Sequence, residues 1–151
     1  MSAAFFDVDG TVTTRTTIFG FLAFYLSHRG DGPEAARAVV DQLHWLRAQG
    51  HSRESVNRAY YRTYAGERRD LLENLGRQWF AYESGSGDFF VPEVKSEIDG
   101  YRRVGIPIVL VSGSFFACLN PLADAWARGW PILAARPPVS AVTPRSRRTG
   151  R

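Results

Sequence analysis

Two aspartates, Asp7 and Asp9, follow a short apolar run and precede a glycine in the segment Asp7-Val8-Asp9-Gly10-Thr11. Because side chains alternate along an extended chain, the two carboxylates are predicted to lie on the same side. One carboxylate can then attack phosphorus, while the other donates a proton to the leaving oxygen and later activates water. The spacing therefore predicts phosphoryl transfer, against the simpler interpretation that the segment is only a turn.

The same pair of carboxylates predicts a divalent cation. Two close carboxylates repel each other and both repel a phosphate dianion, and hard oxygen ligands select Mg²⁺. Gly10 lets the backbone turn so that its amides face the phosphate, and Thr11 can hydrogen-bond and fix the loop. We therefore predict that Asp7 and Asp9 are catalytic and metal-binding, and we place Thr11 among the phosphate-binding residues.

A second polar motif follows another apolar run. Ile106 to Val111 predicts a strand, and Ser112-Gly113-Ser114 comes directly after it. A hydroxyl and free amides where a strand meets a helix N-terminus form an anion site, although these residues alone are also typical of a helix cap. Ser112 and Gly113 are therefore candidate phosphate-binding residues. Both motifs fall at the carboxyl ends of predicted strands, where α/β folds place their active sites.

The elements that must position these motifs follow from apolar periodicity. Ala3 to Val8 predicts a buried strand, and helical patterns then continue as far as a Ser-Gly linker at residues 84–87. Pro33 is predicted to open one of these helices, which Gly50 ends, and Ser52 is predicted to cap the next. A further helix is predicted to stop at Gly105, and another after the second motif, in which Pro121 must produce a kink or begin a new first turn. Ile132 to Ala135 predicts a third strand.

This order of elements predicts an α/β protein with a Rossmann-like core, a parallel sheet and an inserted all-helical cap. We assign residues 1–14 and 86–139 to the core and residues 15–85 to the cap. Residues 140–151 are rich in Pro, Ser, Thr and Arg, which predicts a disordered basic tail.

Composition narrows the partners and the location. The 151 residues are 44% hydrophobic and 23% charged, which is ordinary for one globular domain. The net charge of +4 comes from arginines in the tail, so nucleic acid is not expected as a partner. Cys118 is the only cysteine, no signal peptide is visible, and no apolar stretch is long enough to cross a membrane. We therefore expect a cytoplasmic protein.

The two motifs resemble those of the haloacid dehalogenase (HAD) superfamily. Asp7 to Thr13 is similar to the first motif of that superfamily, and Val109 to Ser114 is similar to the second. The helical block between them resembles the cap of the phosphoserine-phosphatase-like branch, subfamily IB. The resemblance extends over residues 1 to about 139 and implies a phosphatase that acts on a small phosphomonoester.

The resemblance also implies a role for each motif residue. Asp7 would form an aspartyl-phosphate, and Asp9 would be the general acid and base. Mg²⁺ would bind the Asp7 carboxylate and the Asp9 carbonyl oxygen, while Ser112 Oγ and the Gly113 amide would hold the phosphoryl oxygens.

The chain departs from the family pattern after Ser112. The family's lysine and its later acidic cluster have no counterpart there, since Asp124 is the only acid. We therefore expect a chain cut short and little or no hydrolysis by residues 1–151 alone. The alternative is a catalytically inactive HAD-like fragment that serves as a binding or interaction module. In the phosphoserine phosphatases of this family, an acidic residue shortly after the first motif binds the substrate's amino group, and the stretch around Arg15 has no acid. Phosphoserine is therefore not expected as the substrate. Arg15 either contacts an anionic substrate or is solvated.

Overall fold

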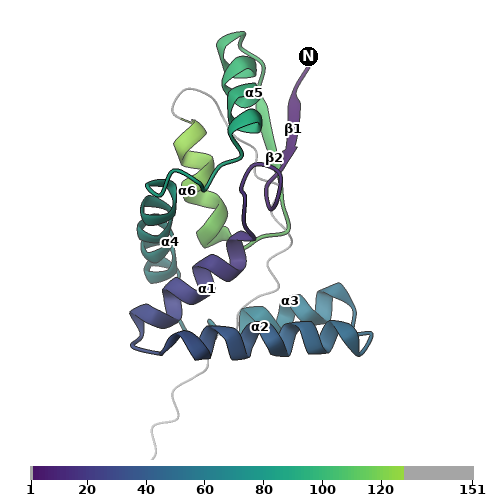
Figure 1. The fold of residues 1–151 in the computed structure, drawn as a ribbon, viewed down its shortest axis with the longest axis vertical. Helices are drawn as coiled ribbons and strands as arrows, with labels where there is room; N and C mark the ends of the chain where they lie inside the picture. The colour runs from purple at the N-terminus through teal and green to yellow at the C-terminus, as the bar shows by residue number, and fades with distance from the viewer. Residues whose placement is uncertain (1, 128–151) are drawn as a thin grey trace, which may run out of the picture.

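A computed structural model describes residues 2–127 (Figure 1). The elements are, in order, β1 (Ala4–Asp7), α1 (Thr17–His28), α2 (Pro33–Ala48), α3 (Arg53–Arg62), α4 (Arg69–Ser84), α5 (Pro92–Arg103), β2 (Ile108–Val111) and α6 (Phe116–Ala127). The α/β class predicted from the sequence is confirmed, as a small parallel sheet in a chain that is otherwise mostly helical. The predicted strand at 132–135 and the predicted tail at 140–151 lie outside the described residues.

The sheet consists of β1 and β2, which pair in parallel with Asp7 opposite Val111. Alternation gives the sheet two different faces. Phe6 is buried on one face, where the ring of Tyr101 from α5 contacts it edge to face at a centroid distance of 6.1 Å. On the opposite face Phe5 and Val111 are 68% and 45% exposed. Within the described residues, the sheet is therefore covered by packing on one face only.

The helix boundaries follow local signals in the sequence. Pro33 lies at the start of α2, as its fixed φ favours. The Ser52 hydroxyl caps α3 by accepting the Ser55 amide at 3.2 Å. Gly50 takes a φ of +83°, which lets the chain leave α2 in the left-handed region. These predicted starts and stops are confirmed within one or two residues.

α4 and α6 pack side by side (Figure 1). Pro121 lies inside α6, which continues through it instead of starting anew. Because proline has no N–H, the carbonyl of Ala117 four residues earlier has no helical donor. That carbonyl faces Gly76 of α4, where a Cβ would come within 2.0 Å of the oxygen. Gly76 therefore allows a backbone approach that any side chain would block.

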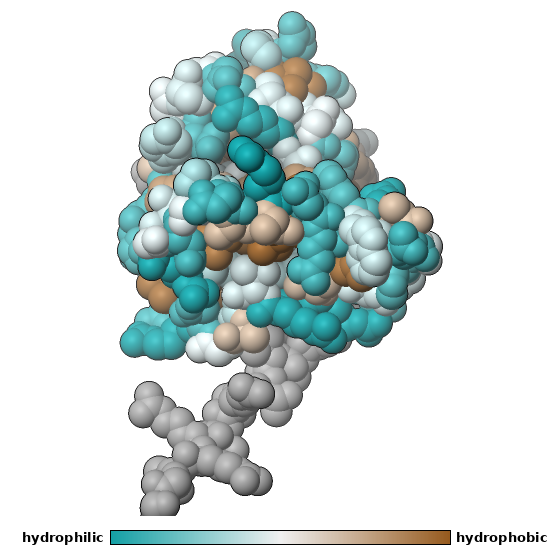
Figure 2. Space-filling model, turned by 60° about the horizontal axis from the view of Figure 1, so that its bottom comes forward, coloured by the Kyte–Doolittle hydropathy of each residue, from teal (hydrophilic) through white to brown (hydrophobic). Residues whose placement is uncertain are grey.

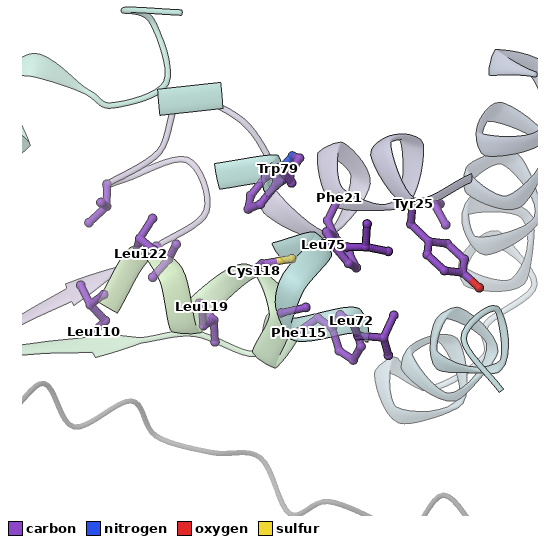
Figure 3. Packing of buried hydrophobic residues seen from close by; sticks show 14 of the residues in the cluster. Phe21, Tyr25, Leu72, Leu75, Trp79, Leu110, Phe115, Cys118, Leu119 and Leu122 are labelled. Atoms are coloured by element: carbon purple, nitrogen blue, oxygen red, sulfur yellow. The ribbon is translucent and has the colours of Figure 1, made fainter. Parts of the chain in front are cut away.

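The hydrophobic core crosses the boundary that the sequence predicts between cap and core. Figure 3 shows Phe21 of α1, Trp79 of α4 and Cys118 of α6 in the same cluster of buried side chains. Phe21 and Trp79 meet edge to face at 6.1 Å, and Cys118 is fully buried. The division at residues 15–85 stays a prediction, and the helices on its two sides share one cluster of buried side chains.

The face of the molecule that carries α2 and α3 is mostly hydrophilic (Figure 2). Figure 2 turns forward the lower end of Figure 1, where α2 and α3 lie, and shows small apolar patches among polar side chains. None of the helices in residues 2–127 combines the length and apolar character that a membrane crossing requires.

Candidate functional site

The sheet register brings the two predicted motifs to the same edge. Asp7 is the last residue of β1 and lies opposite Val111, the last residue of β2. Ser112 follows Val111 directly, so the loop after β2 begins beside the loop after β1. The Asp7 side chain is exposed on the open face of the sheet. The prediction that both motifs follow parallel, neighbouring strands agrees with this arrangement.

The loop after β1 is organised around one carbonyl group. The Val8 oxygen accepts the amides of Thr11, Val12 and Thr13 at 3.2, 3.0 and 3.0 Å. Gly10, at the turn, has a φ of +77°, a conformation that favours glycine. The buried Thr13 hydroxyl lies 3.1 Å from the Val8 oxygen. Thr13 therefore fixes the loop through its side chain, a role that the sequence analysis gave to Thr11.

Asp9 is held at the start of α1. Its Oδ1 accepts the backbone N–H of Thr17 at 2.7 Å. Thr16, at the N-cap position of α1, makes no side-chain capping bond, so the Asp9 carboxylate takes over that function. An anion at a helix N-terminus is favoured by the free N–H groups and by the helix dipole. Asp9 is half-buried, and its orientation is therefore set by its contact with α1.

The loop after β2 presents a hydroxyl and a bare backbone. The Ser114 amide donates to Ser112 Oγ at 3.0 Å, which fixes the Ser112 side chain over the loop. Gly113 is exposed, and Ser112 is half-buried. The Ser114 hydroxyl is buried and lies 2.6 Å from the Thr17 hydroxyl. The two loops are thus connected through Thr17 and Ser114.

One basic residue at this site was missed by the sequence analysis. Arg53 is the first residue of α3, and its Nη2 lies 3.3 Å from where a Cβ on Gly113 would be. The sequence offers one local signal for Arg53: a cation at a helix N-terminus is unfavourable, because it opposes the helix dipole. The guanidinium therefore adds positive charge beside the predicted phosphate-binding amide.

Arg15 lies at the connection between the helical block and the strands. Its guanidinium pairs with Glu83 at 3.2 Å and also with Asp88. The hydroxyl of Ser86 and the charge of Arg15 lower the pKa of Asp88 below its ordinary value. The structure therefore gives Arg15 two carboxylate partners, and its contact with a substrate stays a prediction.

The donor set fits Mg²⁺ in part. No group of three His, Cys, Asp or Glu side chains that could hold a metal occurs within residues 2–127. Mg²⁺ in proteins is nevertheless commonly held by one or two carboxylates, with water and substrate phosphate completing its shell. The Asp7 carboxylate and the Asp9 carbonyl oxygen would supply two oxygen ligands at the edge where both motifs lie. These two residues would hold the ion.

Parallel strands with polar loops at their carboxyl ends are typical of α/β enzymes that bind substrates there. The family model for haloacid dehalogenase-like hydrolases matches residues 4–136, and the chain belongs to that family. The match supports the predicted superfamily and hydrolase class.

A solved structure supports the fold independently. A protein of unknown function from Bordetella pertussis Tohama I is similar with a TM-score of 0.70 and 18% identity. The likeness covers 88% of this chain and 58% of that protein, so this chain spans little more than half of its length. A comparison with curated proteins finds no match. At this identity the likeness concerns the fold alone, and the expectation that the chain is cut short stays a prediction.

Proposed function

We propose that this chain carries the catalytic aspartates of a Mg²⁺-dependent phosphomonoester hydrolase of subfamily IB, acting through an aspartyl-phosphate on Asp7. The observation that supports it best is the strand register, in which Asp7 lies opposite Val111 and the Ser112 loop begins at the next residue. A nucleophile and an anion-binding loop at the same edge are what phosphoryl transfer requires.

The reaction proceeds in two steps. A carboxylate oxygen of Asp7 attacks phosphorus, the bond to the leaving oxygen breaks, and Asp9 donates a proton to that oxygen. Water then attacks the phosphorus, Asp9 accepts its proton, and the bond to Asp7 breaks to release phosphate. When bound, Mg²⁺ neutralises charge on the carboxylates and the phosphate.

The phosphate is held by the loop after β2 and by charge from the helical block. The Ser112 hydroxyl and the Gly113 amide contact the phosphoryl oxygens. Arg53 lies beside Gly113 and supplies positive charge there. The substrate is a small phosphomonoester in the cytoplasm. It is not phosphoserine, because residues 13–17 contain no acid to bind an amino group.

A second candidate is a module that binds phosphate without turning it over. It is favoured by the absence of a third metal ligand in the part of the chain that the structure describes. Without that ligand, the negative charge that develops in the transition state would be poorly stabilised. Binding of phosphate in the ground state does not need this stabilisation, so turnover would be reduced more than binding.

The decisive experiment separates phosphorylation of the protein from turnover. The chain is incubated with Mg²⁺ and either acetyl phosphate or a panel of phosphomonoesters that includes phosphoserine. Intact mass reports a covalent phosphoryl group, and released phosphate reports turnover. Asp7→Asn should abolish both signals, because an amide cannot attack phosphorus. Asp41→Asn, on the exposed side of α2, is the matched control and should change neither signal.

Each outcome decides between the candidates. A phosphoryl group on Asp7 with phosphate release supports the hydrolase. Binding of the phosphate analogue orthovanadate, measured by calorimetric titration, with no covalent intermediate supports the binding module and overturns the hydrolase. Turnover that survives Asp7→Asn removes Asp7 as the nucleophile, and phosphoserine as the best substrate overturns the substrate assignment.

A further inference from the structure

Within residues 2–127, Thr17 is the one residue that contacts both loops of the candidate site through hydrogen bonds. Its backbone N–H donates to Asp9 Oδ1 at 2.7 Å, and its hydroxyl lies 2.6 Å from Ser114 Oγ. Ser114 in turn donates its amide to Ser112 Oγ at 3.0 Å. A chain of hydrogen bonds therefore runs from Asp9 to Ser112, although the two are far apart in the sequence.

The environment makes this chain of hydrogen bonds rigid. Thr17 is 1% exposed and Ser114 is 4% exposed, so neither hydroxyl can exchange its partner for bulk water. A buried hydroxyl that loses its partner is costly. The Thr17 carbonyl also lies 3.7 Å from the buried Cys118 sulfur, which ties the first turn of α1 to α6. The side chain and the backbone carbonyl of Thr17 are thus both held by buried partners.

We propose that Thr17 is the positioning residue of this site, fixing the acid/base Asp9 and the phosphate-binding loop of Ser112 in one common arrangement. The proposal rests on the proposed function, because it needs Asp9 and Ser112 to act on the same phosphoryl group. Thr17 acts through these two neighbours and does not itself contact the substrate. Displacing an aligned catalytic group by about 1 Å costs on the order of a hundredfold in rate, so such an arrangement has functional value.

The position of Thr17 allows its hydroxyl contact to be removed alone or together with its N–H contact. Thr17→Val keeps the shape and the N–H but removes the hydroxyl. Thr17→Pro also removes the N–H, and proline is well tolerated there because Thr17 is the first residue of α1. Thr16, with φ −73° and ψ 113°, already has the conformation that a residue before proline needs. Thr17→Ser keeps both contacts.

Further variants distinguish positioning from a loss of stability. The double variant Thr17→Val with Ser114→Ala leaves no unpaired hydroxyl, so its stability should recover relative to Thr17→Val. Tyr64→Phe is the matched control, since it breaks another buried hydroxyl pair, with Tyr60 at 2.8 Å, and keeps the aromatic ring that stacks on Phe115.

The measurement is calorimetric titration of the full chain with orthovanadate in the presence of Mg²⁺, alongside urea unfolding of each variant. We expect Thr17→Val and the double variant to bind orthovanadate at least about tenfold more weakly than the wild type, and Thr17→Pro more weakly still. Thr17→Ser should bind within about threefold of the wild type. Tyr64→Phe should lose stability and keep its affinity.

The outcomes separate this proposal from the proposed function. If the double variant binds orthovanadate as tightly as the wild type, the positioning role is overturned and the proposed function stands. If affinity merely follows the urea midpoint across all variants, including Tyr64→Phe, Thr17 is only structural and the proposal is likewise overturned. If the wild type binds no orthovanadate, the proposed function itself is overturned, and the positioning role with it.

Discussion

Replacing Gly76 with alanine should destabilise the protein, although alanine is the better helix former. Gly76 is buried in α4 against the Ala117 carbonyl of α6. A Cβ there would lie 2.0 Å from the carbonyl oxygen and 2.8 Å from its carbon, both backbone atoms. The two helices must therefore move apart, which disturbs the shared core around Cys118.

The expected magnitude follows from two opposing terms. Alanine gains up to about 1 kcal/mol of helix propensity over glycine. Overpacking in a well-packed interior costs about 1–3 kcal/mol, and a clash with backbone belongs at the upper end. The net loss in the free energy of unfolding is therefore about 2 kcal/mol for Gly76→Ala. With a urea m-value of about 2 kcal/mol/M, the midpoint should fall by about 1 M.

The matched control is Gly100→Ala in α5. A Cβ on Gly100 would meet only the Arg103 side chain, at 3.9 Å. This variant should therefore gain up to about 1 kcal/mol from propensity alone. Urea unfolding followed by circular dichroism measures both variants. Equal or higher stability of Gly76→Ala, with an unchanged m-value, would refute the close approach of α4 to the Ala117 carbonyl.

Two further predictions concern buried titratable groups. Burial raises the pKa of Tyr60 and Tyr64, so the folded protein keeps phenol protons that the unfolded chain releases above about pH 10. The free energy of unfolding should therefore be steady below that pH and fall as the pH rises beyond it. Urea titrations at about pH 8 and about pH 11 measure this fall. A Tyr64→Phe variant whose free energy of unfolding falls with pH as steeply as that of the wild type would contradict the prediction. Burial also raises the pKa of the Cys118 thiol, so a maleimide should label Cys118 only after unfolding in urea. Equally fast labelling of the native protein would show that α6 is open to solvent.

Local signals in the sequence predicted the elements well. Pro33 at the start of α2, Ser52 as a cap and Gly50 as a stop act on the residues beside them, so their effects are visible without knowledge of the fold. The parallel order of the strands followed from the helical crossover between them. The placement of Asp7 and Ser112 at one edge followed from that order.

The contacts that complete the site could not be predicted in this way. Thr17 and Ser114, or Arg53 and Gly113, are distant in sequence and meet only after α1 and α3 have packed. No spacing or period encodes such a pair. The ion pairs of Arg15 could not be predicted either, because its partners Glu83 and Asp88 lie 68 and 73 residues later in the chain.

The two ends of the helical block lie side by side, and this has a consequence for how the family can diversify. The Thr14 amide donates to the Phe89 carbonyl at 3.0 Å, and the Val91 amide donates to the Val12 carbonyl at the same distance. A short link could therefore bridge the two points, so recombination could exchange the intervening segment for a different one without altering the strands. Such an exchange would also remove Gly76 and expose the side of α6 around Ala117 and Cys118, which are both fully buried. The incoming segment must therefore bring a small residue and an apolar face of its own, and this requirement narrows which segments evolution or a designer could insert.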